Sequence, residues 1–212
     1  MTIAMPRIDR LPQSERGITI ADFLVPIRIG ERISSRARHI ALILLGTLLV
    51  VLATRVIIPV SPVPFTGQTF AVLLVGGALG FRRAALSLSL YLLIGAVGLP
   101  VFSSGRSGTE FLLGATGGYI VGFILAAAVV GRLAELGWDR HLVGSIGAML
   151  IGNLVIYTVG APWLAASTGR SLGDAISVGV TPFLFWDGVK ILLAAGVFPA
   201  AWWLVGRRPG DR

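Results

Sequence analysis

Two ionisable side chains interrupt an otherwise apolar stretch near the C-terminal end of the sequence. Asp187 and Lys190 stand three residues apart between Pro182 and Val205, so on a helix they share one face. Charged groups inside a membrane span are costly and usually mark a functional site. The alternative is a neutralising pair without a ligand, although an apolar pair would serve packing better. The pair predicts a binding site in which Lys190 supplies a cation and Asp187 accepts N–H bonds.

A second pair of polar side chains has the spacing of one helix face. Asn153 and Tyr157 lie four residues apart in an apolar stretch. An asparagine offers both a donor and an acceptor, which suits a ligand amide or urea group, although it can also bond helix to helix. Tyr157 could stack on a ring or simply pack. Thr66 and Gln68 precede another apolar stretch, where they could reach into a pocket or cap a helix.

Two aromatic residues next to glycine-rich or polar segments complete the candidate set. Phe102 follows Pro100, and Tyr119 follows the glycines of Thr116-Gly117-Gly118. Adjacent glycines permit close backbone approach, and a helix start with free N–H groups favours anions, but tight helix packing explains such glycines as well. Phe102 fits either a ligand site or the aromatic belt of a membrane interface.

The composition points to lipid as the main solvent of the chain. Hydrophobic residues make up 55% of the 212 residues, charged residues 13%, and the mean hydropathy is +0.85. A disordered chain or a soluble enzyme would be far more polar. There are no cysteines, and the sequence contains neither a phosphate-binding P-loop nor an HExxH zinc motif. We therefore expect no metal and no cofactor.

Six apolar stretches set the expected architecture. About 20 helical residues cross the hydrocarbon core, and two of the six stretches are short for this. They cover Ile40–Ala53, Phe70–Leu79, Ala84–Leu99, Gly117–Val130, Leu142–Leu164 and Pro182–Val205. The sequence predicts an all-α membrane protein with six transmembrane helices, formed by residues 40–206. Pro62, Pro100 and Pro162 are each expected to open an outer loop, because proline interrupts helix hydrogen bonding.

The distribution of basic residues predicts the orientation. Fourteen of the 18 Lys and Arg residues fall on one side of the six expected spans, three on the other, and Lys190 within a span. Cytoplasmic loops carry an excess of basic residues, so both termini are expected in the cytoplasm. Residues 1–39 form a basic cytoplasmic tail without the apolar core of a signal peptide. The net charge of +8 is thus a topology signal, and no nucleic-acid partner is expected.

Two alanines near the start of the first apolar stretch form a small-xxx-small pair. Ala37 and Ala41 would let another helix approach closely. The sequence leaves open whether that helix belongs to the same chain or to a partner.

Several separated motifs, in this order, resemble the BioY family of biotin-specific S components of energy-coupling factor (ECF) transporters. They span residues 59–195 and leave out the basic tail. They are Pro62-Val63-Pro64-Phe65-Thr66-Gly67-Gln68-Thr69-Phe70, Gly98-Leu99-Pro100-Val101-Phe102, Gly114-Ala115-Thr116-Gly117-Gly118-Tyr119 and Asp187-x-x-Lys190.

This resemblance implies a non-enzymatic subunit that captures biotin near the outer face of a bacterial inner membrane. It implies as partners a transmembrane coupling protein, contacted through Ala37 and Ala41, and two ATPase subunits. In the family the Asp-x-x-Lys pair belongs to the biotin site, here Asp187 and Lys190. Lys190 could hold the biotin carboxylate or its urea carbonyl, and both remain open. The alternatives are an S component for another vitamin or an intramembrane enzyme acting on lipid-linked substrates.

Overall fold

The structure of the chain is a computed structural model that describes residues 18–24 and 35–205. Helices dominate it, and one small β-hairpin interrupts them. The elements are α1 (Ile20–Leu24), α2 (Ser35–Ala53), β1 (Ile57–Ile58), β2 (Phe65–Thr66), α3 (Gln68–Leu79), α4 (Phe81–Ala96), η3 (Ser103–Gly105), α5 (Thr109–Leu113), α6 (Gly117–Glu135), η4 (Trp138–Arg140), α7 (Leu142–Thr168), α8 (Leu172–Gly179), η5 (Thr181–Phe183) and α9 (Leu184–Val205).

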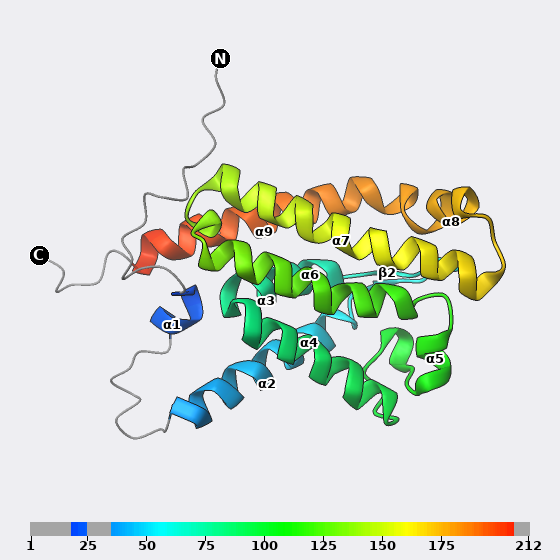
Figure 1. Cartoon of the computed structure of the whole chain (residues 1–212), viewed down its shortest axis with the longest axis horizontal. Helices are drawn as coiled ribbons and strands as arrows, with labels where there is room; N and C mark the ends of the chain where they lie inside the picture. Colours follow the sequence, from blue (N-terminus) through cyan, green and yellow to red (C-terminus); the bar gives the residue numbers. More distant parts are fainter. Residues whose placement is uncertain (1–17, 25–34, 206–212) are drawn as a thin grey trace, which may run out of the picture.

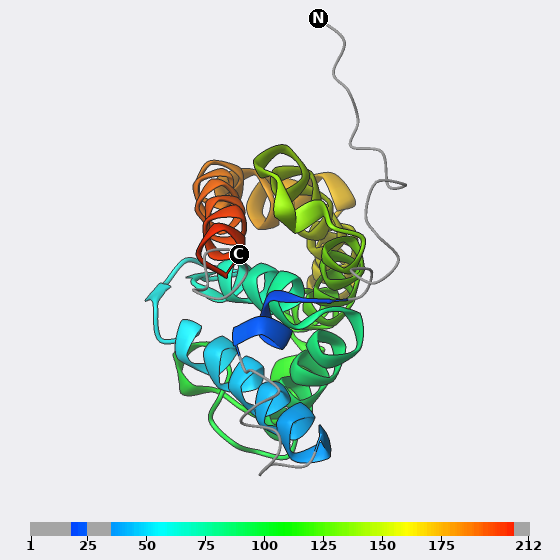
Figure 2. The same cartoon turned by 90° about the vertical axis from the view of Figure 1, so that its left-hand side faces the viewer.

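The long helices form one bundle with α3 and α6 at its centre. Helix α6 packs along α7, α3 and α4, and α9 closes the bundle against α7 and α3. Helix α2 lies on the outside against α3 and α4 (Figures 1 and 2). Within the apolar window of each helix, 61% of α6 residues but only 22% of α2 residues are buried. Helix α2 is therefore the most available of the long helices to lipid or to a partner.

Apolar side chains cover the outside of the bundle as well as its core. The exposed face of α2 presents Ile40, Leu44, Leu45, Leu48 and Leu52, each at least half exposed. Four helical segments are long and apolar enough to cross a membrane, while α3 is a shorter apolar helix. This pattern is that of a multi-pass helical membrane protein, since water would not tolerate so large an apolar surface.

Each of the six apolar stretches corresponds to one helix of the bundle, but the boundaries differ. Helix α2 begins at Ser35, ahead of the boundary expected at residue 40, and α1 forms within the segment expected as a tail. Ile20 and Ala21 of α1 are buried against the bundle. Most of the expected tail, including residues 1–17 and 25–34, lies outside the described residues.

The expectation that Pro162 opens a loop is wrong. Helix α7 continues through Pro162 to Thr168, and Gly169 ends it with a positive φ of 69°. A helix can carry proline when neighbouring groups satisfy the freed carbonyl or a local distortion accommodates it. The short β1–β2 hairpin, which pairs Ile57 with Thr66 and Ile58 with Phe65, was also not expected from the sequence.

Candidate ligand-binding site

A cavity of about 50 Å³ lies inside the bundle, between helices that are distant in the sequence. Its walls come from the hairpin loop, α3, α4, η3, α5, α6, α7, the end of α8, η5 and the start of α9. The lining residues are Val63, Pro64, Gln68, Thr69, Tyr91, Ser103, Phe111, Thr116, Tyr119, Ile120, Phe123, Ile156, Tyr157, Gly179, Phe183 and Asp187. Such a volume holds a few water molecules, so a larger ligand must widen the cavity as it enters.

Asp187 and Lys190 form the ion pair that their spacing predicts. Lys190 Nζ donates to Asp187 Oδ1 at 2.9 Å, and to the Thr66 carbonyl and Thr69 Oγ1 at 2.9 and 3.0 Å. The side chain of Asp187 is 3% exposed and that of Lys190 is 20% exposed. All three ammonium protons therefore have acceptors, which offsets the cost of burial.

The two members of this pair differ in how they face the cavity. Asp187 lines the cavity, whereas Lys190 is not among the lining residues and lies behind Asp187 against β2 and α3. Thr69 connects the two, because its hydroxyl accepts from Lys190 and donates to Asp187 Oδ1 at 3.2 Å. The carboxylate is thus presented to the cavity, and the cation supports it from outside.

Tyr157 of α7 lines the cavity, whereas Asn153, one turn earlier on the same helix, is buried but is not a lining residue. The Tyr157 hydroxyl donates to Asp187 Oδ2 at 2.5 Å, so each carboxylate oxygen has at least one donor. Asn153 is 6% exposed, and its Oδ1 has no hydrogen-bond partner among the described residues. A buried acceptor without a partner calls for an explanation such as water or a ligand.

Gln68 and Tyr91 form a second polar wall. Gln68 Nε2 donates to the Tyr91 hydroxyl at 2.8 Å, and Gln68 Oε1 accepts from Thr66 Oγ1 at 3.1 Å. Tyr91 is fully buried and in turn donates to the Val101 carbonyl at 3.4 Å. Gln68 begins α3 and reaches into the cavity. Thr66 is not a lining residue, and positions Gln68 and Lys190.

Tyr119 and Phe102 occupy different positions. Tyr119 lines the cavity, and its hydroxyl donates to the Gly179 carbonyl at 2.8 Å, which ties α6 to the end of α8. Phe102 is fully buried beside the cavity, with its ring stacked on Phe111 at 5.0 Å and edge-on to Tyr91 at 5.5 Å. It is not a lining residue, and its ring lies where a side chain on Gly95 would collide.

Thr69, Tyr91 and Phe183 are site residues that were not singled out from the sequence. Thr69 bridges the ion pair, and Tyr91 lies on α4, which shows no pattern connecting it to Gln68. Phe183 lines the cavity, and its ring stacks on Phe65 of β2 with centroids 4.1 Å apart. No local sequence signal links these three residues, because only the fold brings α3, α4 and η5 to one cavity.

The cavity combines a buried acceptor group with an apolar enclosure. Asp187, Gln68 and Tyr157 supply hydrogen-bonding groups at one wall, while Phe111, Phe123 and Ile156 supply apolar surface. Such a site suits a small ligand with N–H donors and an apolar body. Among the residues that the structure describes, no group of His, Cys, Asp or Glu side chains is arranged to hold a metal ion.

Ala37 and Ala41 do not line the cavity and lie on the outer surface of the bundle. Both are exposed on α2, beside the apolar side chains of its outer face. Both lie on α2, which has the smallest buried share of the four candidate spans in the described structure.

The fold and the site define a multi-pass helical membrane protein with a ligand cavity enclosed by its bundle. The chain belongs to the BioY family, whose profile matches residues 28–207.

Relatives named as biotin transporters and a solved structure are similar to the chain over most of its length. It is 39% identical to "Biotin transporter BioY" of Thermotoga maritima over 149 residues, which cover 70% of this chain and 86% of that protein. It is 36% identical to "Biotin transporter BioY2" of Lactococcus lactis subsp. cremoris, with 76% and 87% covered. The crystal structure of the S-component for biotin from an ECF-type ABC transporter superposes with a TM-score of 0.72 at 24% identity, covering 79% of this chain and 92% of that one. The two chains share a fold.

Proposed function

We propose that the chain is the biotin-binding S subunit of a biotin uptake transporter and is not itself an enzyme. The observation that carries this is membership of the BioY family, with relatives named biotin transporters that match more than two thirds of the chain. The cavity supports it independently, since it offers the carboxylate of Asp187 and the amide of Gln68 beside an aromatic enclosure. Biotin combines a urea ring that donates two N–H bonds with an apolar body.

The geometry supports an arrangement that differs from both alternatives left open by the sequence, because Lys190 contacts neither the carboxylate nor the urea carbonyl of biotin in it. Asp187 faces the cavity and Lys190 does not, so Asp187 accepts a urea N–H of biotin. Lys190 then acts as a positioning residue that holds Asp187 and the Thr66 carbonyl in place. Asn153 Oδ1, buried without a partner among the described residues, supplies a further acceptor when the cavity widens. The biotin carboxylate points away from the ion pair.

The proposal extends to topology and partners. Six helices span a bacterial inner membrane, with both termini in the cytoplasm as the basic residues predict. The cavity opens to the outer face, and ATP hydrolysis resides in two partner ATPases that act through a transmembrane coupling protein. Helix α2 provides the coupling surface through Ala37 and Ala41, which the exposure of both residues supports.

Uptake by whole cells tests this function. A biotin-auxotrophic bacterium without its own biotin transporter is given this chain together with the coupling protein and ATPases of an ECF system. We expect growth on trace biotin and accumulation of labelled biotin, which excess unlabelled biotin but not thiamine or riboflavin abolishes. Uptake of a different vitamin would assign the site to that vitamin, and uptake of no vitamin would contradict the proposal.

A further inference from the structure

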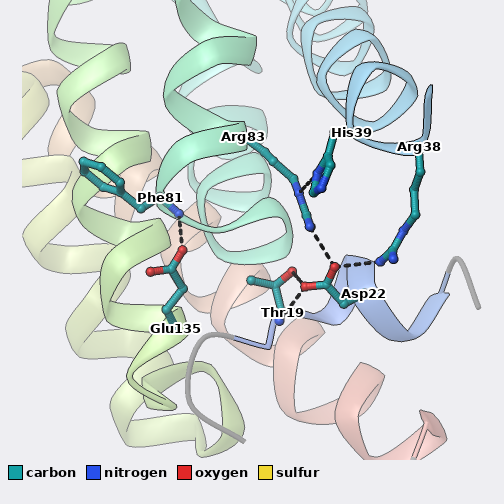
Figure 3. Close-up of polar contacts among 7 residues, drawn as sticks. All are labelled: Thr19, Asp22, Arg38, His39, Phe81, Arg83 and Glu135. Carbon is teal, nitrogen blue, oxygen red and sulfur yellow. Dashed lines mark hydrogen bonds and ion pairs between the residues drawn. The ribbon is translucent and has the colours of Figure 1, made fainter. Parts of the chain in front are cut away.

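A second and larger hollow lies at the end of the bundle that carries α1, and it shares no lining residue with the cavity. It is an open groove of about 670 Å³ between α1, the start of α2, the α3–α4 turn and the end of α6 (Figure 3). Its polar rim carries His39, Arg82, Arg83 and Arg132 with Asp22 and Glu135. Its apolar wall carries Ile43, Leu79 and Leu86. We call it the basic groove.

The carboxylates of the basic groove are already engaged by cations. Asp22 accepts from Arg38 at 2.6 Å and from Arg83 at 2.9 Å. Burial opposes the charged form of Asp22, but hydrogen bonds from Arg83 and Thr19 and the charge of Arg83 outweigh it, so its pKa lies below the usual value. Glu135 accepts from Arg132 at 3.1 Å and from the Phe81 N–H at 2.9 Å. Of the three arginines that line the groove, Arg83 and Arg132 are therefore paired with Asp22 and Glu135, and Asp22 is also paired with Arg38 outside the lining.

Several donors at the rim remain without an acceptor. Arg82 is exposed and has no hydrogen bond or ion pair with the described residues. Arg83 donates from Nε to His39 Nδ1 at 2.9 Å, but its second terminal nitrogen is buried without a partner in the described part of the chain. Because His39 accepts at Nδ1, its proton resides on Nε2 and makes it a further donor. An anion is the missing complement of such a rim, and phosphate oxygens, like carboxylates, match the paired donors of arginine.

We propose that the basic groove binds an anionic phospholipid, with the phosphate at Arg82, Arg83 and His39 and an acyl chain along Ile43 and Leu86. The groove carries both parts of such a ligand: unpaired donors at the rim and an apolar wall that continues onto exposed helix surface, where Leu86 is 54% exposed. Basic pockets between helices at a membrane surface recognise anionic headgroups in this way. A soluble phosphate would use the rim and leave the apolar wall uncovered.

Native mass spectrometry of the full chain in an uncharged detergent tests the site. The delipidated protein is titrated with phosphatidylglycerol and with phosphatidylcholine of the same acyl chains. We expect one phosphatidylglycerol to be retained in preference to phosphatidylcholine, and Arg82→Gln to weaken its retention about tenfold, the effect of losing one charged contact. Arg36→Gln, which removes an exposed charge on α2 outside the groove, serves as the matched control and leaves retention unchanged.

Two further arms separate this lipid from other occupants. Leu86→Gln should weaken phosphatidylglycerol binding, and millimolar inorganic phosphate should fail to displace the lipid. Displacement by inorganic phosphate would overturn the proposal in favour of a soluble anion. Equal retention of both lipids, or equal losses in Arg82→Gln and Arg36→Gln, would overturn it in favour of a nonspecific charged surface. Helical content by circular dichroism confirms that each variant is folded.

Discussion

At the scale of residues, the roles of Asp187 and Lys190 follow from which of them faces the cavity. Asp187 presents its carboxylate inward, and Lys190 is saturated by Thr66, Thr69 and Asp187. A ligand carboxylate could bind Lys190 only by displacing one of these acceptors. The two side chains therefore form one unit, and we propose that its contact with the ligand is the carboxylate.

Lys190→Gln tests this assignment. The substitution keeps the size of the side chain but removes the cation that positions Asp187. We expect biotin and an uncharged biotin amide to lose affinity equally, by about tenfold or more, since hydrogen bonds to charged groups contribute about 1.5–3 kcal/mol. The measurement is equilibrium dialysis of both ligands. A loss confined to biotin would show that Lys190 holds the ligand carboxylate.

Phe183 is the residue whose removal should alter ligand release. Its ring lines the cavity and stacks on Phe65 at 4.1 Å, which connects η5 to β2 across the site. Phe183→Ala should speed biotin dissociation by about tenfold, because aromatic pairs contribute about 0.5–1.5 kcal/mol. Stopped-flow chase with unlabelled biotin measures it. Phe185→Ala is the matched control, because Phe185 is 71% exposed on α9. A similar acceleration in Phe185→Ala would show that Phe183 has no specific role in holding the ligand.

The sequence predicted the ion pair but not its surroundings. Spacing of three and four residues placed Asp187 beside Lys190 and Asn153 on the face of Tyr157, because helix geometry is local. Tyr91 and Phe183 escaped prediction, since their contacts with Gln68 and Phe65 depend on how distant elements pack. Phe102 and Thr66 do not line the cavity and contact the lining residues Phe111 and Gln68, and their expected contact with a ligand stays a prediction.

At the scale of elements, a hydrogen bond to a buried carboxylate connects the turn between α6 and α7 to α9. Asp139 is 1% exposed, and its Oδ2 accepts from Trp202 Nε1 at 2.7 Å. Burial raises the pKa of Asp139 to about 6, although the Trp202 hydrogen bond and the charge of Arg140 act to lower it. The folded protein thus binds this proton more tightly than the unfolded chain does.

Stability should therefore fall as the pH rises from about 4 to about 6 and level off above that range. A shift of this size corresponds to about 3 kcal/mol. Asp139→Asn keeps an acceptor for Trp202 and removes the ionisation, so the variant should lose this pH dependence and exceed wild type in stability near neutral pH. Thermal unfolding in detergent at several pH values measures it, with the exposed Asp174→Asn as control. An unchanged pH profile in Asp139→Asn would contradict the assignment.

Helix α2 is the element that the proposal gives to the coupling protein. Ala41 is exposed on it beside a row of leucines. Ala41→Trp should block close helix approach, and so reduce copurification with the coupling protein and uptake, while biotin binding by the isolated subunit stays intact. Leu193→Trp, on the exposed face of α9, controls for added bulk. Loss of biotin binding in Ala41→Trp would instead place this residue in internal packing.

Each apolar stretch of the sequence corresponds to a helix of the described structure, in the same order, whereas the helix ends, the connections and the short helices α1, α5 and α8 were not predicted. Apolar length marks each long helix, but Pro162 inside α7 and the hairpin of β1 and β2 depend on tertiary contacts. A proline tolerated by neighbouring helices has the same local signature as one that starts a loop.

At the scale of the whole molecule, orientation follows from the basic residues. Fourteen of the 18 Lys and Arg residues fall on the side that we assign to the cytoplasm. An alkaline phosphatase reporter, active only outside the membrane, should therefore be silent when fused after Arg212 and active when inserted at Arg170. Activity at Arg212 would contradict the six-span topology.

Capture of biotin through the carboxylate of Asp187 is tested by equilibrium binding of labelled biotin to the purified full chain, compared with Asp187→Asn. We expect one biotin per wild-type chain and an affinity in Asp187→Asn weaker by about 10- to 100-fold, because a charged acceptor is lost while side-chain size is kept. A folded Asp187→Asn protein that binds biotin with wild-type affinity would contradict the account.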